Sequence, residues 1–326
     1  MKSFFQILTS AFILFFITGM FTSCGGGGSR SAKPGDLHGK ITISGAFALY
    51  PMTLKWADEF KKIHPGITFN ISAGGAGKGM ADALSHMVDL GMFSKEVSPE
   101  EKAKGAWFIP VAKDAVLPTV NANNPVIADL RKQGLSHQAF YDIFITGKIT
   151  TWGQATHTKS SEDLQALTRS DACGAAEMWA KYLDKKKKQE DLIGLGVNGD
   201  PGIADAVRKN VNAIGFNNLN FAYDMNTRKP YAGMAIVPID LNGNGKIDPD
   251  ENFYDTMDHV MKAILDGRYP SPPARDLYLV AGGEPKDPNV RAFLKWILGD
   301  GQKFVNDAGY ITIAKEKLDE GLERLK

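Results

Sequence analysis

Three short loops of small residues each lead into a helix-like segment. Such loops favour the binding of an anion. They span residues 44–50, 74–79 and 172–175, and the second reads Gly-Gly-Ala-Gly-Lys-Gly. The first backbone N–H groups of a helix have no partner within the helix, and the helix dipole favours negative charge there. Arg169 adds a fixed cation just before the third loop, and Asp171 is placed to orient it. Together these features predict an oxyanion-binding site.

The glycine-rich segment 74–79 shares only its Gly-Lys pair with a nucleotide-binding P-loop. Ser72 stands where the first glycine of that motif belongs, and Gly79 stands where a serine or threonine would hold magnesium. We therefore reject nucleotide binding by this segment.

Strand-like and helix-like segments alternate along the chain and must position these loops. Helices are predicted at 51–63, 80–87, 175–186, 254–265 and 290–298. Strands are predicted at 41–43, 67–71, 88–91, 107–111, 116–120 and 165–168. This alternation is typical of an α/β protein with largely parallel sheets, and its length favours two lobes.

The first residues indicate an exported, membrane-anchored protein. Lys2 precedes the apolar stretch 11–21, and Phe21-Thr22-Ser23-Cys24 resembles a bacterial lipobox. We expect a signal peptide at 1–23, a lipid on Cys24 and a flexible tether at 24–37. An uncleaved anchor or a plain secretory signal remains an alternative. With Cys24 modified, Cys173 has no cysteine partner for a disulfide within the chain.

Charge and motif content argue against several other functions. The 38 Lys and Arg residues nearly balance the 37 Asp and Glu residues, so a nucleic-acid partner is not expected. No metalloprotease, nucleophile-elbow or CxxC motif occurs. Thiol catalysis by Cys173 at a helix start is the strongest enzymatic alternative, but no histidine can be placed beside it from the sequence.

Several ordered motifs resemble the phosphate-binding proteins of ABC transporters, the PstS type. They are Ser-Gly-Ala-Phe-Ala-Leu-Tyr-Pro at 44–51, Gly-Ala-Gly-Lys-Gly at 75–79, Ile-Phe-Ile-Thr-Gly-Lys-Ile-Thr-Thr-Trp at 143–152 and Arg-Ser-Asp-Ala-Cys-Gly-Ala at 169–175. The resemblance implies a type II periplasmic-binding-protein fold with two crossover hinge strands. It implies lobe one at 38–116 and 235–326, and lobe two at 117–234. A monomer that delivers phosphate or a similar oxyanion to an ABC permease is expected, with no enzymatic activity and no required cofactor.

The resemblance also implies the ligand-binding positions, with Asp171 in a supporting role. They are Leu49, Tyr50, Ala76, Gly77, Ser94, Arg169, Cys173, Gly174 and Ala175. The family carries side-chain hydroxyls where this chain has Leu49, Ala76, Cys173 and Ala175. Each lost hydrogen bond to a charged ligand would cost about 1.5–3 kcal/mol. A different ligand, or a role as a sensor partner on the same fold, therefore remains an alternative.

Residues 240–251 match a calcium-binding loop at every specified position, independently of this resemblance. The predicted ligands are Asp240, Asn242, Asn244, Lys246 through its carbonyl, Asp248 and Glu251. The preceding residues resemble a strand, so a single structural calcium ion is expected rather than a sensor pair. A polar turn without metal is the alternative.

Overall fold

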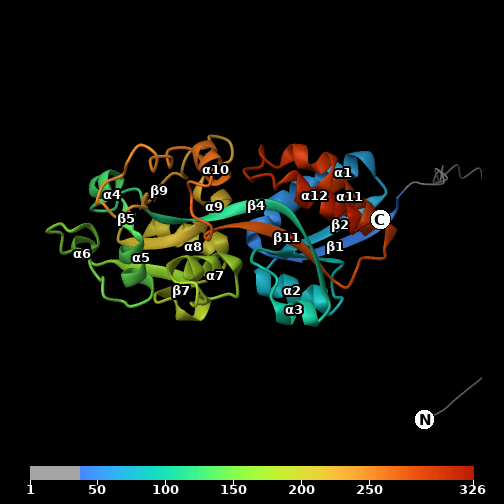
Figure 1. The fold of residues 1–326 in the computed structure, drawn as a ribbon, viewed down its shortest axis with the longest axis horizontal. Helices are drawn as coiled ribbons and strands as arrows, with labels where there is room; N and C mark the ends of the chain where they lie inside the picture. The colour runs from blue at the N-terminus through green and yellow to red at the C-terminus, as the bar shows by residue number, and fades with distance from the viewer. Residues whose placement is uncertain (1–36) are drawn as a thin grey trace, which may run out of the picture. The chain divides into compact units, whose positions relative to one another are not determined.

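The computed structural model describes residues 37–326, which form two lobes along the longest axis of the molecule (Figure 1). The predicted signal peptide, the lipidated Cys24 and nearly all of the tether lie outside the described residues. Within residues 37–326, no helix is both long enough and apolar enough to cross a membrane.

The first lobe is built on three parallel strands. Its elements are β1 (Gly39–Gly45), η1 (Phe47–Leu49), α1 (Tyr50–Ile63), β2 (Ile67–Ala73), α2 (Ala76–Leu84), β3 (Leu90–Phe93), α3 (Pro99–Ala103), α11 (Pro288–Leu298), η3 (Asp300–Phe304) and α12 (Lys315–Glu323). Strand β1 pairs in parallel with both β2 and β3. Pro51 lies in the first turn of α1, where a missing N–H costs no helical bond, and Trp56 and Phe60 bury the inner face of the helix.

The second lobe surrounds a second set of parallel strands. Its elements are α4 (Ile127–Gln133), β5 (Leu135–Ser136), α5 (His137–Phe144), α6 (Trp152–Thr156), β6 (Gln165–Arg169), α7 (Gly174–Leu183), η2 (Gln189–Asp191), β7 (Leu195–Val197), α8 (Gly199–Lys209), β8 (Ala213–Asn218), α9 (Leu219–Ala222), β9 (Met234–Ile236), β10 (Ile239–Asp240) and α10 (Met257–Leu265). Strand β6 pairs in parallel with β7 and β8. Trp179 of α7 stacks on Phe216 of β8 with ring centroids 5.8 Å apart, and this contact holds α7 against the sheet.

Two long strands, β4 (Ala106–Asn121) and β11 (Ala274–Gly282), pass from one lobe into the other (Figure 1). They pair antiparallel, from Ala106 opposite Gly282 to Ala115 opposite Ala274. Strand β11 also pairs with β3 of the first lobe, whereas β4 continues into pairs with β8 and β9 of the second. The structure therefore has the two crossover strands that the resemblance implied.

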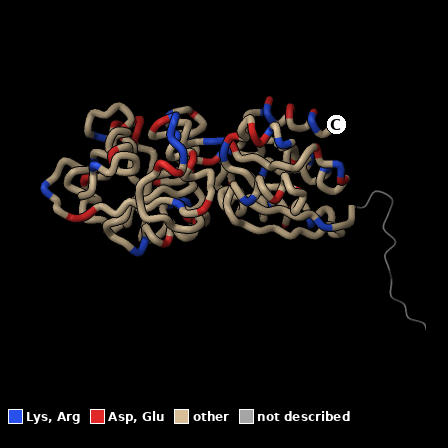
Figure 2. The backbone as a smooth tube through the Cα atoms, turned by 90° about the horizontal axis from the view of Figure 1, so that it is seen from below, with Lys and Arg blue, Asp and Glu red and all other residues tan. Residues whose placement is uncertain are grey.

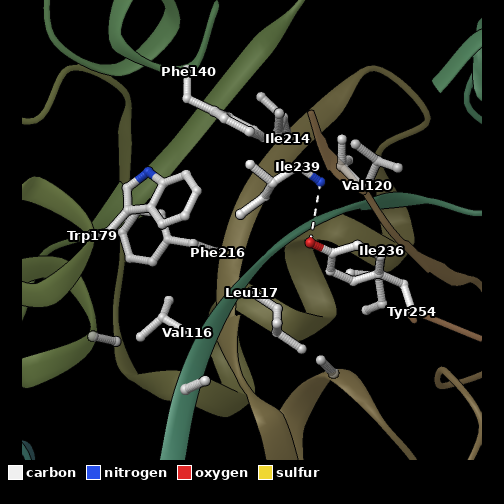
Figure 3. Close-up of a cluster of buried hydrophobic side chains, with 14 of the residues drawn as sticks. Val116, Leu117, Val120, Phe140, Trp179, Ile214, Phe216, Ile236, Ile239 and Tyr254 are labelled. Carbon is white, nitrogen blue, oxygen red and sulfur yellow. Dashed lines mark hydrogen bonds between the residues drawn. The ribbon is translucent and has the colours of Figure 1, made fainter. Parts of the chain in front are cut away.

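The second lobe extends further along the chain than the predicted boundary at residue 235. Ile236, Ile239 and Tyr254 lie in one buried cluster with Val116 and Val120 of β4 (Figure 3). The physical reason is strand pairing, because β9 hydrogen-bonds to β4 and carries the following segment to the same side. The predicted assignment of residues 235–274 to lobe one is thus wrong. The first lobe comprises mainly residues 37–112 and 277–326, and the second mainly residues 115–274.

Candidate oxyanion site between the lobes

The second and third loops of the sequence analysis lie against each other across the two lobes. Gly77, in the first turn of α2, donates its backbone N–H to the carbonyl oxygen of Ala172 at 3.2 Å. Gly174 lies so close to Ser94, which follows β3, that a Cβ atom at Gly174 would be 2.1 Å from the Ser94 carbonyl oxygen. Gly77, Ser94 and Gly174 therefore come from two lobes to one place and leave no room for a larger residue at 174. The Gly77 N–H, at a predicted ligand-binding position, is occupied by Ala172 in this arrangement.

The first loop folds into η1, and this turn uses the N–H groups of Leu49 and Tyr50, two of the predicted ligand-binding positions. Leu49 is fully buried and donates its N–H to Ala46 at 3.2 Å, while the Tyr50 N–H donates to the Phe47 carbonyl oxygen. Ala76, the first residue of α2, is also buried and offers no polar side-chain group. The prediction of a free Tyr50 N–H is thus wrong in this arrangement.

The third loop presents the N–H groups best placed for an anion. Cys173 is the N-cap of α7, and its Sγ accepts the N–H of Ala176 at 3.4 Å. Among residues 37–326, no hydrogen-bond partner is found for the N–H groups of Gly174 and Ala175. Gln189 braces the loop, because its side chain accepts the Cys173 N–H at 3.0 Å and donates to the Asp171 carbonyl oxygen at 2.7 Å. The start of α7 therefore offers two adjacent donors on a fixed loop.

Arg169, at the end of β6, is buried between two carboxylates. Its Nε and Nη2 donate to the two oxygens of Asp171 at 2.8 Å and 2.7 Å. Its Nη1 lies 2.9 Å from Oδ2 of Asp200, the second residue of α8. That contact is close but poorly aligned, so within the described chain Nη1 has no hydrogen-bond acceptor. Asp171 thus orients Arg169, as predicted, and Asp200 is a second partner that the sequence analysis did not identify.

The buried network continues from Arg169 to the crossover strands. Asp200 accepts a hydrogen bond from the Asn218 amide, and Asn218 in turn accepts one from Nη2 of Arg275 on β11. The same Nη2 lies 3.5 Å from Oδ2 of Asp114 on β4, the residue directly opposite Arg275 in the strand pair. A continuous chain of polar groups therefore joins the candidate site to the hinge strands.

The acids in this network have pKa values that are shifted in different directions. Burial alone would raise the pKa of Asp171, but the hydrogen bonds and charge of Arg169 outweigh it, so the pKa ends below the usual value. Burial dominates for Asp200, whose pKa is raised despite Arg169. For Asp114, burial raises the pKa to about 6, and the attraction of Arg275 offsets only part of that effect. Arg169 therefore favours the ionised form of Asp171.

Cys173 lacks the properties of a catalytic thiol. Its side chain is buried, and burial raises the pKa of the thiol to about 12, although the nearby charge of Arg169 acts in the opposite direction. A thiol with this pKa carries almost no thiolate near neutral pH. The geometry therefore gives Cys173 a capping role in α7.

A cavity of about 250 Å³ lies beside this network. It is bordered by Glu96 of the first lobe, by Met178 and Lys181 of α7, and by Lys113 and Arg275 of the crossover strands. Elsewhere, Figure 2 shows positive and negative residues interspersed along both lobes. The cavity lining also includes Asp276, which pairs with Lys113 at 3.4 Å, so cations and carboxylates both border it.

The predicted calcium loop is closed by its own hydrogen bonds. Asp240 accepts the N–H groups of Gly243 and Gly245, each at 2.8 Å, and Glu251 accepts that of Leu241 at 2.9 Å. Asp248 pairs with Lys246 at 2.7 Å. Within residues 37–326, no group of three or more His, Cys, Asp or Glu side chains converges to hold a metal ion. Calcium binding by this loop stays a prediction.

Comparison with known proteins assigns the family. Residues 30–301 match the family described as the PBP superfamily domain. The chain belongs to the PBP superfamily. Its members among solved structures include type II periplasmic binding proteins, so the predicted α/β two-lobed fold is confirmed.

Curated relatives and solved structures also confirm the expected resemblance to PstS-type proteins. The chain is 26% identical to the phosphate-binding protein PstS of Staphylococcus saprophyticus, over 93% of this chain and 89% of the relative. It is 24% identical to PstS of Methanocaldococcus jannaschii, over 92% and 89% of the two chains. A phosphate-bound substrate-binding protein of a putative phosphate ABC transporter from Clostridium perfringens aligns with a TM-score of 0.68 and 23% identity, over 85% of this chain and all of that one. The relatives are named as binding proteins, not enzymes.

Proposed function

We propose that this protein binds a tetrahedral oxyanion, with phosphate as the first candidate, between its lobes and delivers it to an ABC permease. The observation that carries this proposal is the start of α7. There, the unpartnered N–H groups of Gly174 and Ala175 follow the buried Arg169, whose Nη1 has no aligned acceptor. Relatives named phosphate-binding proteins support the same ligand. Charged ligands are bound well by such preformed backbone donors, because no side chain has to be ordered on binding.

A different oxyanion is the second candidate, and two observations favour it. Leu49, Ala76 and Ala175 provide no hydroxyl groups to a phosphate ion. In addition, Arg169 is already shared between Asp171 and Asp200, which lowers its net attraction for an anion. Both features would reduce the binding affinity less for an oxyanion that needs fewer hydrogen bonds than phosphate.

We further propose that the protein acts outside the cytoplasm as a monomer held at the membrane by lipid on Cys24. The lipobox-like segment supports this location. Mass spectrometry of the protein purified from membranes should find the lipid on Cys24, and Cys24→Ser should release the protein from the membrane fraction. An unmodified Cys24 in the membrane-bound protein would disprove the anchor.

The central experiment is isothermal titration of lipid-free residues 24–326 with phosphate, arsenate, sulfate and molybdate. Phosphate should bind with the lowest dissociation constant if the first candidate is right. Tighter binding of sulfate or molybdate would instead identify the second candidate. Heat signals at buffer level for all four anions would reject the proposed function. Arg131→Lys is a suitable control, because Arg131 is exposed at the end of α4 in the second lobe.

A further inference from the structure

The charges around Arg169 do not by themselves suit an anion. Arg169 contributes one positive charge, whereas its partners Asp171 and Asp200 contribute two negative charges when both are ionised. A doubly charged oxyanion entering this group would meet a negative excess in a poorly solvated place, where repulsion is strong. A second cation close to Arg169 would offset one of these negative charges.

Arg275 is the buried cation nearest to this group along the hydrogen-bond network. It is only 5% exposed, and its Nη2 reaches Asp200 through Asn218. It also borders the cavity that Met178 and Lys181 of α7 line. Its position on β11 places it where the two lobes meet, rather than inside either lobe.

Two nitrogens of Arg275 have no partner within the described part of the chain. Within residues 37–326, neither Nε nor Nη1 has a hydrogen-bond acceptor, although both are inaccessible to solvent. Buried donors on a charged group almost always have acceptors, because an unmet one costs about 1–3 kcal/mol or more. Nη2 alone is used, by Asn218 and at 3.5 Å by Asp114. Arg275 is thus a buried cation with unused donors.

We propose that Arg275 is a ligand-binding residue that supplies the second guanidinium of the oxyanion site. This inference rests on the proposed function and deepens it. The ligand class is a doubly charged tetrahedral oxyanion, whose oxygens take the unused donors of Arg275 together with the N–H groups at the start of α7, beside Arg169. The added cation compensates for the missing hydroxyls, and it links ligand binding directly to the crossover strands.

The test compares phosphate affinities by isothermal titration at about pH 8. Removal of Arg275 alone would leave Asp114 buried without its cation, so the informative pair is Asp114→Asn and the double variant Asp114→Asn with Arg275→Gln. Both lack the Asp114 charge, and the Gln side chain can still donate to Asn218. The double variant should bind phosphate at least about tenfold more weakly than Asp114→Asn, the loss expected for a charged hydrogen bond. Arg131→Lys should match the parent protein.

The outcomes separate this inference from the proposed function. Equal phosphate affinity in the two variants, with both folded by circular dichroism, would overturn the role of Arg275 while the proposed function stands. No oxyanion binding by the parent protein would reject both. If the double variant fails to fold, a crystal structure of the parent protein with phosphate decides: an Arg275 nitrogen within hydrogen-bond distance of a phosphate oxygen supports the inference, and a separation beyond that distance overturns it.

Discussion

Gly77 of the first lobe donates its backbone N–H to the carbonyl oxygen of Ala172 in the second lobe, over 3.2 Å. The same N–H is one of the donors that the sequence predicted for an anion. This bond holds the second and third loops together, and the contact of Gly174 with Ser94 lies beside it. The contact between the lobes and the candidate site therefore involve the same few residues, so this contact can be tested at one of them.

Gly174→Ala should prevent this close contact between the lobes without unfolding either lobe. The added Cβ would lie 2.1 Å from the Ser94 carbonyl oxygen, and backbone cannot move aside as a flexible side chain can. We expect phosphate affinity to fall at least about tenfold and the radius of gyration in X-ray scattering to stay large when phosphate is added. Gly202→Ala in α8, where the nearest atom is a Val197 methyl at 3.2 Å, is the control. Ligand-dependent compaction of Gly174→Ala would contradict the closed contact.

Arg169→Lys tests the orienting pair with Asp171. Lysine keeps the positive charge but cannot donate in parallel to both oxygens of Asp171, so phosphate affinity should fall about 10- to 100-fold. Arg169→Ala would lose binding and also leave Asp171 and Asp200 without their cation, which should destabilise the fold by about 3–5 kcal/mol. Titration calorimetry and urea unfolding measure the two effects. Unchanged affinity in a folded Arg169→Lys variant would show that the anion binds elsewhere.

Cys173 should react slowly with iodoacetamide in the folded protein. Burial raises its pKa to about 12, so the reactive thiolate is scarce and the sulfur is hard to reach. At about pH 8 we expect labelling at least about 100-fold slower than in urea, followed for Cys173 alone by peptide mass spectrometry. Rapid native labelling would contradict the capping role and revive the thiol-enzyme alternative.

The crossover strands show which parts of the fold the sequence could and could not predict. Alternating apolar residues correctly indicated strands at 107–111 and 116–120, but these are one strand, β4. The polar residues Lys113 and Asp114 made the pattern look interrupted. Their partners are Asp276 and Arg275 on β11, far along the chain, so no local pattern could reveal them. The only sign of the buried Asp114–Arg275 pair in the sequence was a charged residue, Asp114, between two apolar runs.

The site shows the same division between local and distant information. Loops before helices and the Arg169-Asp171 spacing are local features, and the structure brings Gly77, Ser94 and Gly174 together. Asp200 and Arg275 reach the site only through sheet topology. The free N–H expected at Tyr50 failed for a different reason, because η1 satisfies it within the loop. Helix starts in sequence thus indicate candidate donors, but the turn that precedes each helix decides which remain free.

Asp114 should make the stability depend on pH. Its pKa is raised from 3.8 to about 6 on folding, so the folded state holds the proton more tightly than the unfolded state. The resulting stabilisation is complete below about pH 4 and is lost as the pH rises through about 6. Arg275 opposes the shift, the Leu219 N–H donates to the carboxylate at 3.3 Å, and the charge of Asp200 reinforces the shift.

Urea unfolding of the parent protein and Asp114→Asn at pH values on either side of this window measures the effect. From about pH 4.5 to 7.5, the parent protein should lose on the order of 1–3 kcal/mol of unfolding free energy relative to Asp114→Asn. Because the other acids are the same in both proteins, the difference between their unfolding free energies reports on Asp114 alone. Asp58→Asn, exposed on α1, should show no such relative change. A pH-independent difference between the parent protein and Asp114→Asn would contradict a raised pKa.

Calcium should stabilise the protein if residues 240–251 bind it. Asp240, Asp248 and Glu251 would exchange their present partners for the ion, and Asp248 would have to release Lys246. With an affinity of about 10⁻⁴ to 10⁻³ M, calcium at about ten times the dissociation constant would add about 1.4 kcal/mol to the free energy of unfolding. Thermal unfolding with chelator and with millimolar calcium, repeated on Glu251→Gln and on Asp250→Asn as the non-ligand control, measures this. A calcium-dependent rise in melting temperature that is lost in Glu251→Gln but kept in Asp250→Asn would establish the site. Equal melting temperatures with and without calcium in the parent protein would leave a turn closed by its own hydrogen bonds.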